Sequence, residues 1–259
     1  MLMYIFIFFI LLIFFCIINN YISKKYIEKF DNNIIFLNNV QLLNILINNN
    51  DNYYDKFYGN DFNARNIKNI DEYKHLMKQS VTDFNDIQKK KIRKCISNAD
   101  SYFSKLNLEW FNGNKNNKIK WIIGSVKGKL YENGLPHTRN NVIIMSHEKI
   151  NNYSENFLTK TLIHEKVHIY QKNHSDDIEI YLNKNKFNKI KERDIYDNIR
   201  ANPDLDNWIY KDNKENIYKA IYKDNPSSIE DIEYKPVNNQ SYEHPFEKMA
   251  IEIENKYNI

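Results

Sequence analysis

Residues 161–170 read TLIHEKVHIY and contain His164, Glu165 and His168 as an H-E-x-x-H motif. Histidines four residues apart on a helix share one face, so both imidazoles can reach one metal ion. Glu165 lies about 100° further round the helix, where its carboxylate can contact a water on the metal without taking a coordination position. Such an arrangement indicates a hydrolytic centre, in which zinc acidifies the water and the carboxylate accepts its proton.

The residues around the motif predict a helix from Ser154 to about Asn173. Ser154 can cap the first turn, and the charge of Glu155 favours the positive end of the helix dipole. Apolar residues flank the histidine face, as they do in a helix that is buried at the floor of a cleft. Lys166, inside the motif, is expected to point to solvent.

The stretch 161–170 resembles the extended signature of the zinc metallopeptidases, or zincins. It departs from that signature at Lys166, because the signature has uncharged residues around the histidines. The resemblance implies Zn²⁺ as the cofactor, His164 and His168 as metal ligands, and Glu165 as the catalytic base. It also implies hydrolysis of peptide bonds, with a peptide or a protein as the substrate.

A catalytic zinc has three protein ligands and one open position, so a third ligand is required. His174 falls on the last histidine of H-E-x-x-H-x-x-G-x-x-H, the metzincin pattern, but Gln171 stands in place of the glycine. That glycine lets the helix stop and the chain turn back to the metal. A helix that continues past Gln171 directs His174 elsewhere, and a Met-turn is not evident. His174 is therefore the alternative ligand.

The favoured third ligand is Glu247, in the E-x-x-A stretch at residues 247–250. Pro245 is a good first helical residue and predicts a final helix from Pro245 to about Tyr257. The stretch resembles the gluzincins, in which a glutamate from a later helix completes the zinc site and a small residue lets the two helices approach. Glu243 precedes this helix and is the second alternative.

Residues 118–124 and 142–145 predict strands, with a turn at 133–136 between them. The strand just before the motif helix resembles the edge strand of metallopeptidases, to which an extended peptide adds through main-chain hydrogen bonds. Further helices are expected between the motif helix and the final helix. The sequence thus predicts an α+β domain, mostly helical and zincin-like, with a small β-sheet and an active-site helix.

Hydrolysis of a peptide also needs a hydrogen-bond donor for the oxyanion that forms on the carbonyl. Tyr210, Tyr242 and His244 are candidates, although the chain has 19 tyrosines and the sequence singles out none of them. Trp208 and Tyr210 are expected to pack in the core. His137 is interpreted as a polar turn residue rather than as a substrate contact.

Residues 1–18 form an unbroken apolar run without a charge. The run is just long enough to span the hydrocarbon core of a membrane, and it lacks the basic start and the cleavage site of a signal peptide. We therefore expect a single-pass transmembrane anchor at 1–22, an Asn-rich juxtamembrane region at 23–78 and a metallopeptidase-like domain at 79–259. The lysines after the run place that domain on the cytosolic side by the positive-inside rule.

Charge and cysteine content argue against several other classes of protein. The net charge is +4, and the two cysteines, Cys16 and Cys95, cannot form a disulfide framework or a zinc cluster. The densest basic run, KKKIRK at 89–94, lies on a predicted helix over 82–106 and is interpreted as a solvated helix face, so no nucleic-acid partner is expected. The alternative to an enzyme is a structural or interaction protein on the membrane that keeps the fold without turnover.

Overall fold

The computed structural model describes residues 33–194, 198–236 and 242–257. The expected transmembrane anchor at 1–22 lies outside these ranges. Among the residues that are described, no helix combines the length and the apolar character needed to cross a membrane. Helices and sheets both contribute to the fold, as the α+β expectation requires.

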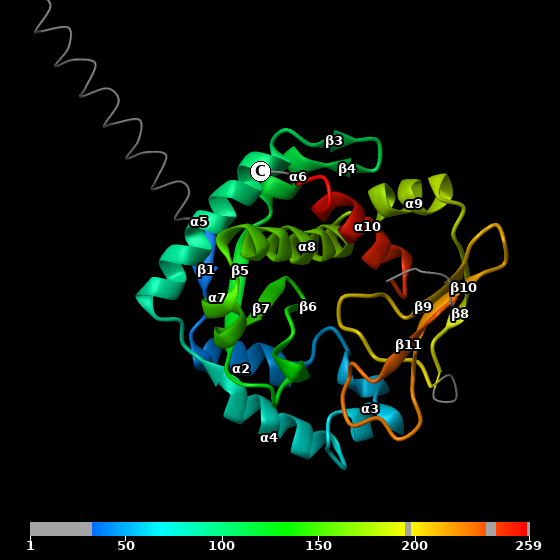
Figure 1. The fold of residues 1–259 in the computed structure, drawn as a ribbon, viewed down its shortest axis with the longest axis horizontal. Helices are drawn as coiled ribbons and strands as arrows, with labels where there is room; N and C mark the ends of the chain where they lie inside the picture. Colours follow the sequence, from blue (N-terminus) through cyan, green and yellow to red (C-terminus); the bar gives the residue numbers. More distant parts are fainter. Residues whose placement is uncertain (1–32, 195–197, 237–241, 258–259) are drawn as a thin grey trace, which may run out of the picture. The chain divides into compact units, whose positions relative to one another are not determined.

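A mixed sheet supports the motif helix (Figure 1). Its strand order is β1 (Ile34–Phe36), β5 (Trp121–Val126), β7 (Val142–Ser146) and β6 (His137–Arg139), and β2 (Val81–Thr82) also pairs with β5. β5 and β7 are parallel, whereas β6 and β7 are antiparallel. Every residue of β7 is buried, as expected for a strand with helices on both faces of its sheet.

Helices cover the two faces of this sheet. On one face α2 (Asn39–Asn48) and α4 (Ile70–Ser80) share a hydrophobic core with β5 and β7. Gly124 of β5 makes this close approach possible, because a Cβ there would come within 2.5 Å of Leu42 of α2. The other face carries α8 (Glu155–Asn173), which packs against α5 (Asp86–Phe103) and α10 (Pro245–Glu254) (Figure 1).

The predicted helix bounds are confirmed for α8 and for the start of α10. Ser154 caps α8 by accepting a hydrogen bond from the N–H of Phe157, and Pro245 opens α10. α10 ends at Glu254, three residues before the expected end at Tyr257. The remaining elements are α3 (Asn60–Ala64), α6 (Gly113–Lys118), α7 (His147–Asn152), α9 (Ser175–Lys184), two short 3₁₀ helices (Tyr54–Lys56 and Glu132–Gly134) and the pair β3 (Asn107–Leu108) and β4 (Phe111–Asn112).

The expectation of further helices after α8 is correct only for α9. The rest of that region forms a second, antiparallel sheet of β8 (Asn188–Glu192), β9 (Trp208–Lys211), β10 (Ile217–Tyr222) and β11 (Ile232–Lys235). In β10 the side chains of Tyr218, Ala220 and Tyr222 are buried and alternate with more exposed neighbours. This period of two is that of a strand with one covered face.

The edge of the first sheet is β6 and not, as expected, the strand that directly precedes the motif helix. That strand, β7, lies between β5 and β6. Asn140 adopts a left-handed conformation (φ 51°) and turns the chain back between β6 and β7. Because asparagine tolerates this conformation, the segment from His137 forms a hairpin rather than one strand.

Residues 36–259 form one compact unit, which includes residues 36–78 of the expected juxtamembrane region. Arg65 lies in the segment that was expected to be juxtamembrane, and its guanidinium makes a bidentate pair with Glu132, with two N···O distances of 2.9 Å. Both side chains are buried. Burial alone would raise the pKa of Glu132, but the charge of Arg65 lowers it to about 2.

The basic run on α5 is only partly the expected solvated face. The ammonium of Lys91 donates to the carbonyl oxygens of Ile150 and Tyr153, both at 2.6 Å, and so binds the C-terminal end of α7. Lys94 forms an ion pair with Glu155 in the first turn of α8, and there both side chains are exposed. Part of this charge therefore joins helices to one another.

Lys166 does not point to solvent. α8 is buried on most of its surface, and the Lys166 side chain lies between α8 and the start of β5, with no exposed area. Its Nζ donates to the carbonyl oxygens of Ile119 (2.6 Å) and Lys120 (2.9 Å) and lies 4.4 Å from the centre of the Trp121 ring. Burial lowers the pKa of Lys166 to about 7, and the charge of Asp100 opposes this shift only in part.

We expect Arg65→Met to lower the free energy of unfolding by about 3–5 kcal/mol, because it leaves the Glu132 carboxylate buried without its counter-charge. Urea unfolding of the full chain measures this loss. Lys68→Met is the matched control, since Lys68 is an exposed cation three residues away. The double variant Arg65→Met/Glu132→Gln should recover part of the stability. A loss below about 1 kcal/mol for Arg65→Met would contradict a structural role of this pair.

We expect Lys166 to make the protein more stable as the pH rises from 7 to 9. In this window the unfolded chain keeps the Lys166 proton and the folded chain does not, so the free energy of unfolding rises with pH, by about 2 kcal/mol from this group. Lys166→Met should remove this rise, whereas Lys160→Met on the same helix should keep it. Urea unfolding at pH 7, 8 and 9 tests this, and equal slopes for the parent chain and Lys166→Met would show that Lys166 is charged when buried.

Candidate metal centre

Three side chains from two helices converge beside the sheet. His164 and His168 lie on α8, and Glu247 lies in the first turn of α10. The His164 Nε2 atom is 3.1 Å from His168 Nε2 and 3.3 Å from Glu247 Oε2, and His168 Nε2 is 3.8 Å from Glu247 Oε2. Among the described residues these three form the group suited to hold a metal ion. The structure therefore brings together the two expected histidines and the favoured third residue.

The two alternative ligands lie elsewhere. His174 follows the last residue of α8, and its ring stacks on that of Tyr170, with 4.2 Å between the centroids. Glu243 precedes α10, where its carboxylate accepts hydrogen bonds from Arg200 and from Asn202 (2.9 Å for the latter). Both side chains have other partners, in agreement with the preference for Glu247.

Hydrogen bonds on the far side of each imidazole fix which ring atom faces the centre. His168 Nδ1 lies 2.9 Å from Gln171 Oε1, and Gln171 Nε2 donates to the carbonyl oxygen of Phe246, so the amide oxygen must face His168. His164 Nδ1 lies 3.0 Å from a carboxylate oxygen of Glu254. Both Nδ1 atoms are therefore donors, and in the neutral rings both Nε2 atoms present lone pairs to Glu247.

This donor set fits zinc. Two imidazole nitrogens and one carboxylate oxygen are typical zinc ligands, and ligands bound tetrahedrally at 2.0–2.1 Å are separated by about 3.3 Å. The three separations between the ligand atoms range from 3.1 to 3.8 Å. Ala250, one turn after Glu247, is fully buried, as expected for a small residue that lets α10 approach α8.

The charges at the centre favour a cation between the three groups. Burial alone would lower the pKa of His164, but its hydrogen bonds with Glu247 and Glu254 raise it well above the usual value. Burial alone would raise the pKa of Glu247, yet the two histidines hold it well below the usual value. Without a metal, the His164 ring thus carries a second proton on Nε2, where it faces Glu247. A metal ion would replace that proton.

Glu165 is buried at 4% exposure, and its Oε2 atom has no hydrogen-bond partner among the described residues. Burial raises the pKa of Glu165 well above the usual value, and the nearby charges of Asp204 and Glu247 add to this effect, which His164 only partly opposes. A raised pKa makes the carboxylate a stronger base towards the proton of a water.

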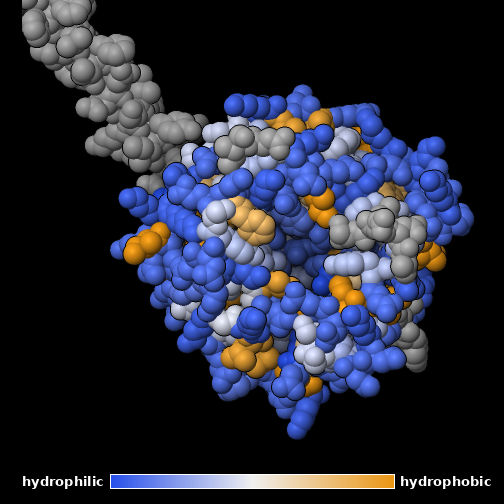
Figure 2. Space-filling model, viewed as in Figure 1, coloured by the Kyte–Doolittle hydropathy of each residue, from blue (hydrophilic) through white to orange (hydrophobic). Residues whose placement is uncertain are grey.

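Glu165, His164 and Glu247 line a cavity of about 200 Å³. His137, Pro136 and residues 200–204 line it as well. The face of the molecule in Figure 2 is hollowed near its centre, where hydrophilic residues surround the recess. His137, expected to be a turn residue, is instead the first residue of β6 and is buried, with its Nδ1 atom 2.9 Å from the carbonyl oxygen of Leu135.

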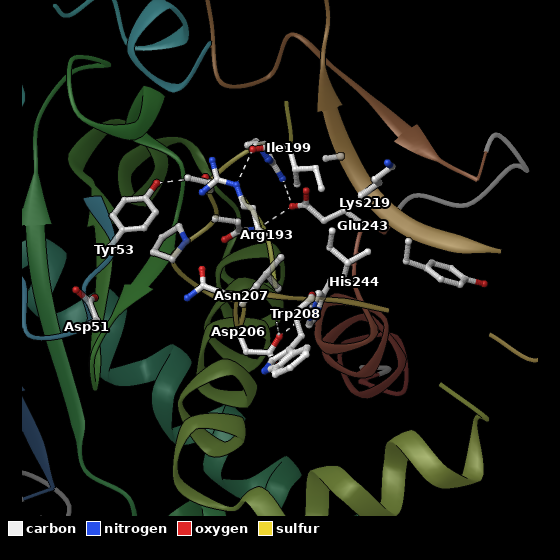
Figure 3. A pocket seen from close by; sticks show the side chains of 18 of the residues that line it. Asp51, Tyr53, Arg193, Ile199, Asp206, Asn207, Trp208, Lys219, Glu243 and His244 are labelled. Carbon is white, nitrogen blue, oxygen red and sulfur yellow. Dashed lines mark hydrogen bonds and ion pairs between the residues drawn. The ribbon is translucent and has the colours of Figure 1, made fainter. Parts of the chain in front are cut away.

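The three candidates for an oxyanion donor do not line this cavity. Tyr210 donates its hydroxyl to Asp206 (2.7 Å), and Tyr242 stacks on Tyr218. His244 caps α10 and lies 3.1 Å from Asp206. Figure 3 shows Asp206 and His244 in a neighbouring pocket of about 70 Å³. Tyr210 is fully buried, as expected for a core residue, and Trp208 is partly buried.

Several residues of the site were not found from the sequence. Glu254 lies seven residues, two helical turns, after Glu247, and Gln171 lies three residues after His168. Helical spacing places each on the same face as its neighbour, so this signal was present. Asn202 and Asp204 reach the site from a loop whose position depends on contacts across the whole domain, and no local pattern marks them.

No protein-family model matches this chain, and neither a curated protein nor a solved structure matches it.

Proposed function

We propose that this protein is a zinc-dependent metallopeptidase of the gluzincin type, anchored in a membrane by its apolar N-terminal segment. His164, His168 and Glu247 would hold the metal, and Glu165 would be the catalytic base. A peptide or a protein would be the substrate.

The unpartnered Glu165 carboxylate carries this proposal. Burial of a carboxylate oxygen without a hydrogen bond destabilises a fold, and a position beside potential metal ligands would give that cost a catalytic use. The group lies beside three atoms that can together bind a metal ion. An acceptor kept open next to a metal centre is what hydrolysis by an activated water requires.

The reaction then assigns a task to each side chain. The two histidines and Glu247 would hold zinc, which would supply Lewis acidity to a water and to the scissile carbonyl. Glu165 accepts a proton from the water as its oxygen bonds to the carbonyl carbon. It returns that proton to the amine nitrogen as the C–N bond breaks.

Gln171 and Glu254 are positioning residues in this scheme. Each accepts a hydrogen bond from the Nδ1 atom of a histidine, which fixes the ring orientation and makes Nε2 the better ligand. Glu254 comes from the same helix as Glu247, so α10 supplies both a ligand and the support of another ligand.

We expect the full chain to bind one zinc ion and Glu247→Ala to bind it at least about 100-fold more weakly, because two histidines alone hold zinc poorly. Elemental analysis and competition with a chelator measure this. His174→Ala is the matched control and should keep the zinc. Loss of zinc from His174→Ala, with retention in Glu247→Ala, would indicate a metzincin-like site instead.

We expect Glu165→Gln to reduce peptide hydrolysis by about 10²–10⁴-fold while zinc stays bound, because the amide cannot accept the proton of the water. Cleavage of a mixed peptide library, followed by mass spectrometry, gives the activity, and elemental analysis gives the zinc content. A Glu165→Gln variant with full activity would rule out this base.

A further inference from the structure

The edge strand β6 has no free main-chain groups at its central residue. Thr138 directs its N–H and its carbonyl oxygen away from β7, where an added peptide strand would pair. Its N–H donates to Asp204 Oδ1 at 2.6 Å, and its hydroxyl donates to the same oxygen at 2.6 Å. Lys172 Nζ donates to the Thr138 carbonyl oxygen at 3.3 Å and lies 2.7 Å from the hydroxyl oxygen.

The segment that covers β6 also reaches the metal centre. We call residues 201–204 the plug. The amide of Asn202 donates to Glu247 Oε1 at 3.2 Å and to Glu243 Oε1 at 2.9 Å. The backbone N–H of Asp204 donates to Asn202 Oδ1 at 3.0 Å, so the two side chains belong to one turn. The plug therefore extends from the third metal ligand to the substrate edge.

Other contacts hold the plug in place. The N–H of Ala201 donates to Asp61 at 3.0 Å, and the Tyr53 hydroxyl donates to the carbonyl oxygen of Ala201 at 3.3 Å. Lys172 Nζ also donates to the carbonyl oxygen of Pro203, at 3.0 Å. Ala201 and Asp204 are both buried. These bonds make the plug part of the folded domain.

The space left beside the metal centre is small. The cavity measures about 200 Å³ and all four plug residues line it. Sites for small ligands usually measure roughly 300–1,000 Å³, and an extended peptide needs a longer groove. Peptide binding along β6 therefore requires the plug to move.

We propose that the plug is an autoinhibitory element, which must release Thr138 before a peptide can pair with β6. This inference rests on the proposed peptidase function. It concerns access to the site and not the metal itself. In the closed state a molecule that needs only the metal can bind, whereas a molecule that also needs the edge strand cannot.

Two hydroxamates separate these requirements in the zinc-loaded full chain. Acetohydroxamate carries a metal-binding group alone, and a tripeptidyl hydroxamate adds an extended backbone. We expect Asp204→Ala to raise the affinity for the tripeptidyl compound, relative to acetohydroxamate, by about tenfold, since it removes the acceptor that occupies the Thr138 N–H. Isothermal titration calorimetry measures both affinities, and Lys172→Met should act in the same direction.

The matched control is Asp204→Asn, whose amide oxygen can still accept from Thr138 and should leave the affinity ratio close to that of the parent chain. Asp212→Ala removes a hydrogen-bonded aspartate in the β9–β10 turn and should also leave it unchanged. An equal ratio in the parent chain, Asp204→Ala and Lys172→Met would overturn the proposal.

Amide exchange at Thr138 tests the plug without a metal. Exchange should be slow in the parent chain and at least about tenfold faster in Asp204→Ala, because the N–H loses its partner. Equal exchange rates at Thr138 in the parent chain and in Asp204→Ala would overturn the proposed role of the plug, even if zinc binds. Absence of zinc, with neither hydroxamate bound to any variant, would instead refute the proposed function, and with it the inhibitory role of the plug.

Discussion

The arrangement of the site depends on the contact between α8 and α10. This contact brings two ring nitrogens and a carboxylate oxygen together, and in a buried location such a cluster requires a positive charge. A proton on His164 or a metal ion can supply it. The packing of the small Ala250 against α8 and the capping of α10 by His244 both serve to place Glu247 at this point.

Burial of α8 has further effects on its charged residues. Lys166 satisfies two carbonyl groups just before β5, where the chain enters the sheet, whereas Glu165 remains without a partner at Oε2. Two adjacent charged residues of one motif thus have opposite environments. One completes the packing of the helix on the sheet, and the other faces the cavity.

Sequence patterns predicted the features that depend on residues close together in the chain. The cap at Ser154, the start of α10 at Pro245 and the shared face of the two histidines follow from spacing along the chain. Glu247, in contrast, was chosen because its stretch resembles the gluzincins. Three features do not follow from such spacing. They are the second sheet, the position of β6 rather than β7 at the edge of the first sheet, and the burial of Lys166. Each depends on residues far apart in sequence, such as Ile119 for Lys166, so the signature alone left its orientation open. The boundary expected at residue 79 rested on the Asn-rich composition of the preceding region, which does not reveal the buried residues of α2 and α4.

The pair of Arg65 and Glu132 has a consequence for how this sequence can change over evolutionary time. Glu132 pairs with Arg65 from the N-terminal part of the domain and also lines the cavity. One carboxylate therefore connects that part of the domain to the site. A substitution of either partner alone leaves the other charge buried without its counter-charge. The two positions are therefore expected to vary together. A lineage that loses residues 36–78 would have to replace Glu132 as well, and would thereby alter the wall of its own cavity.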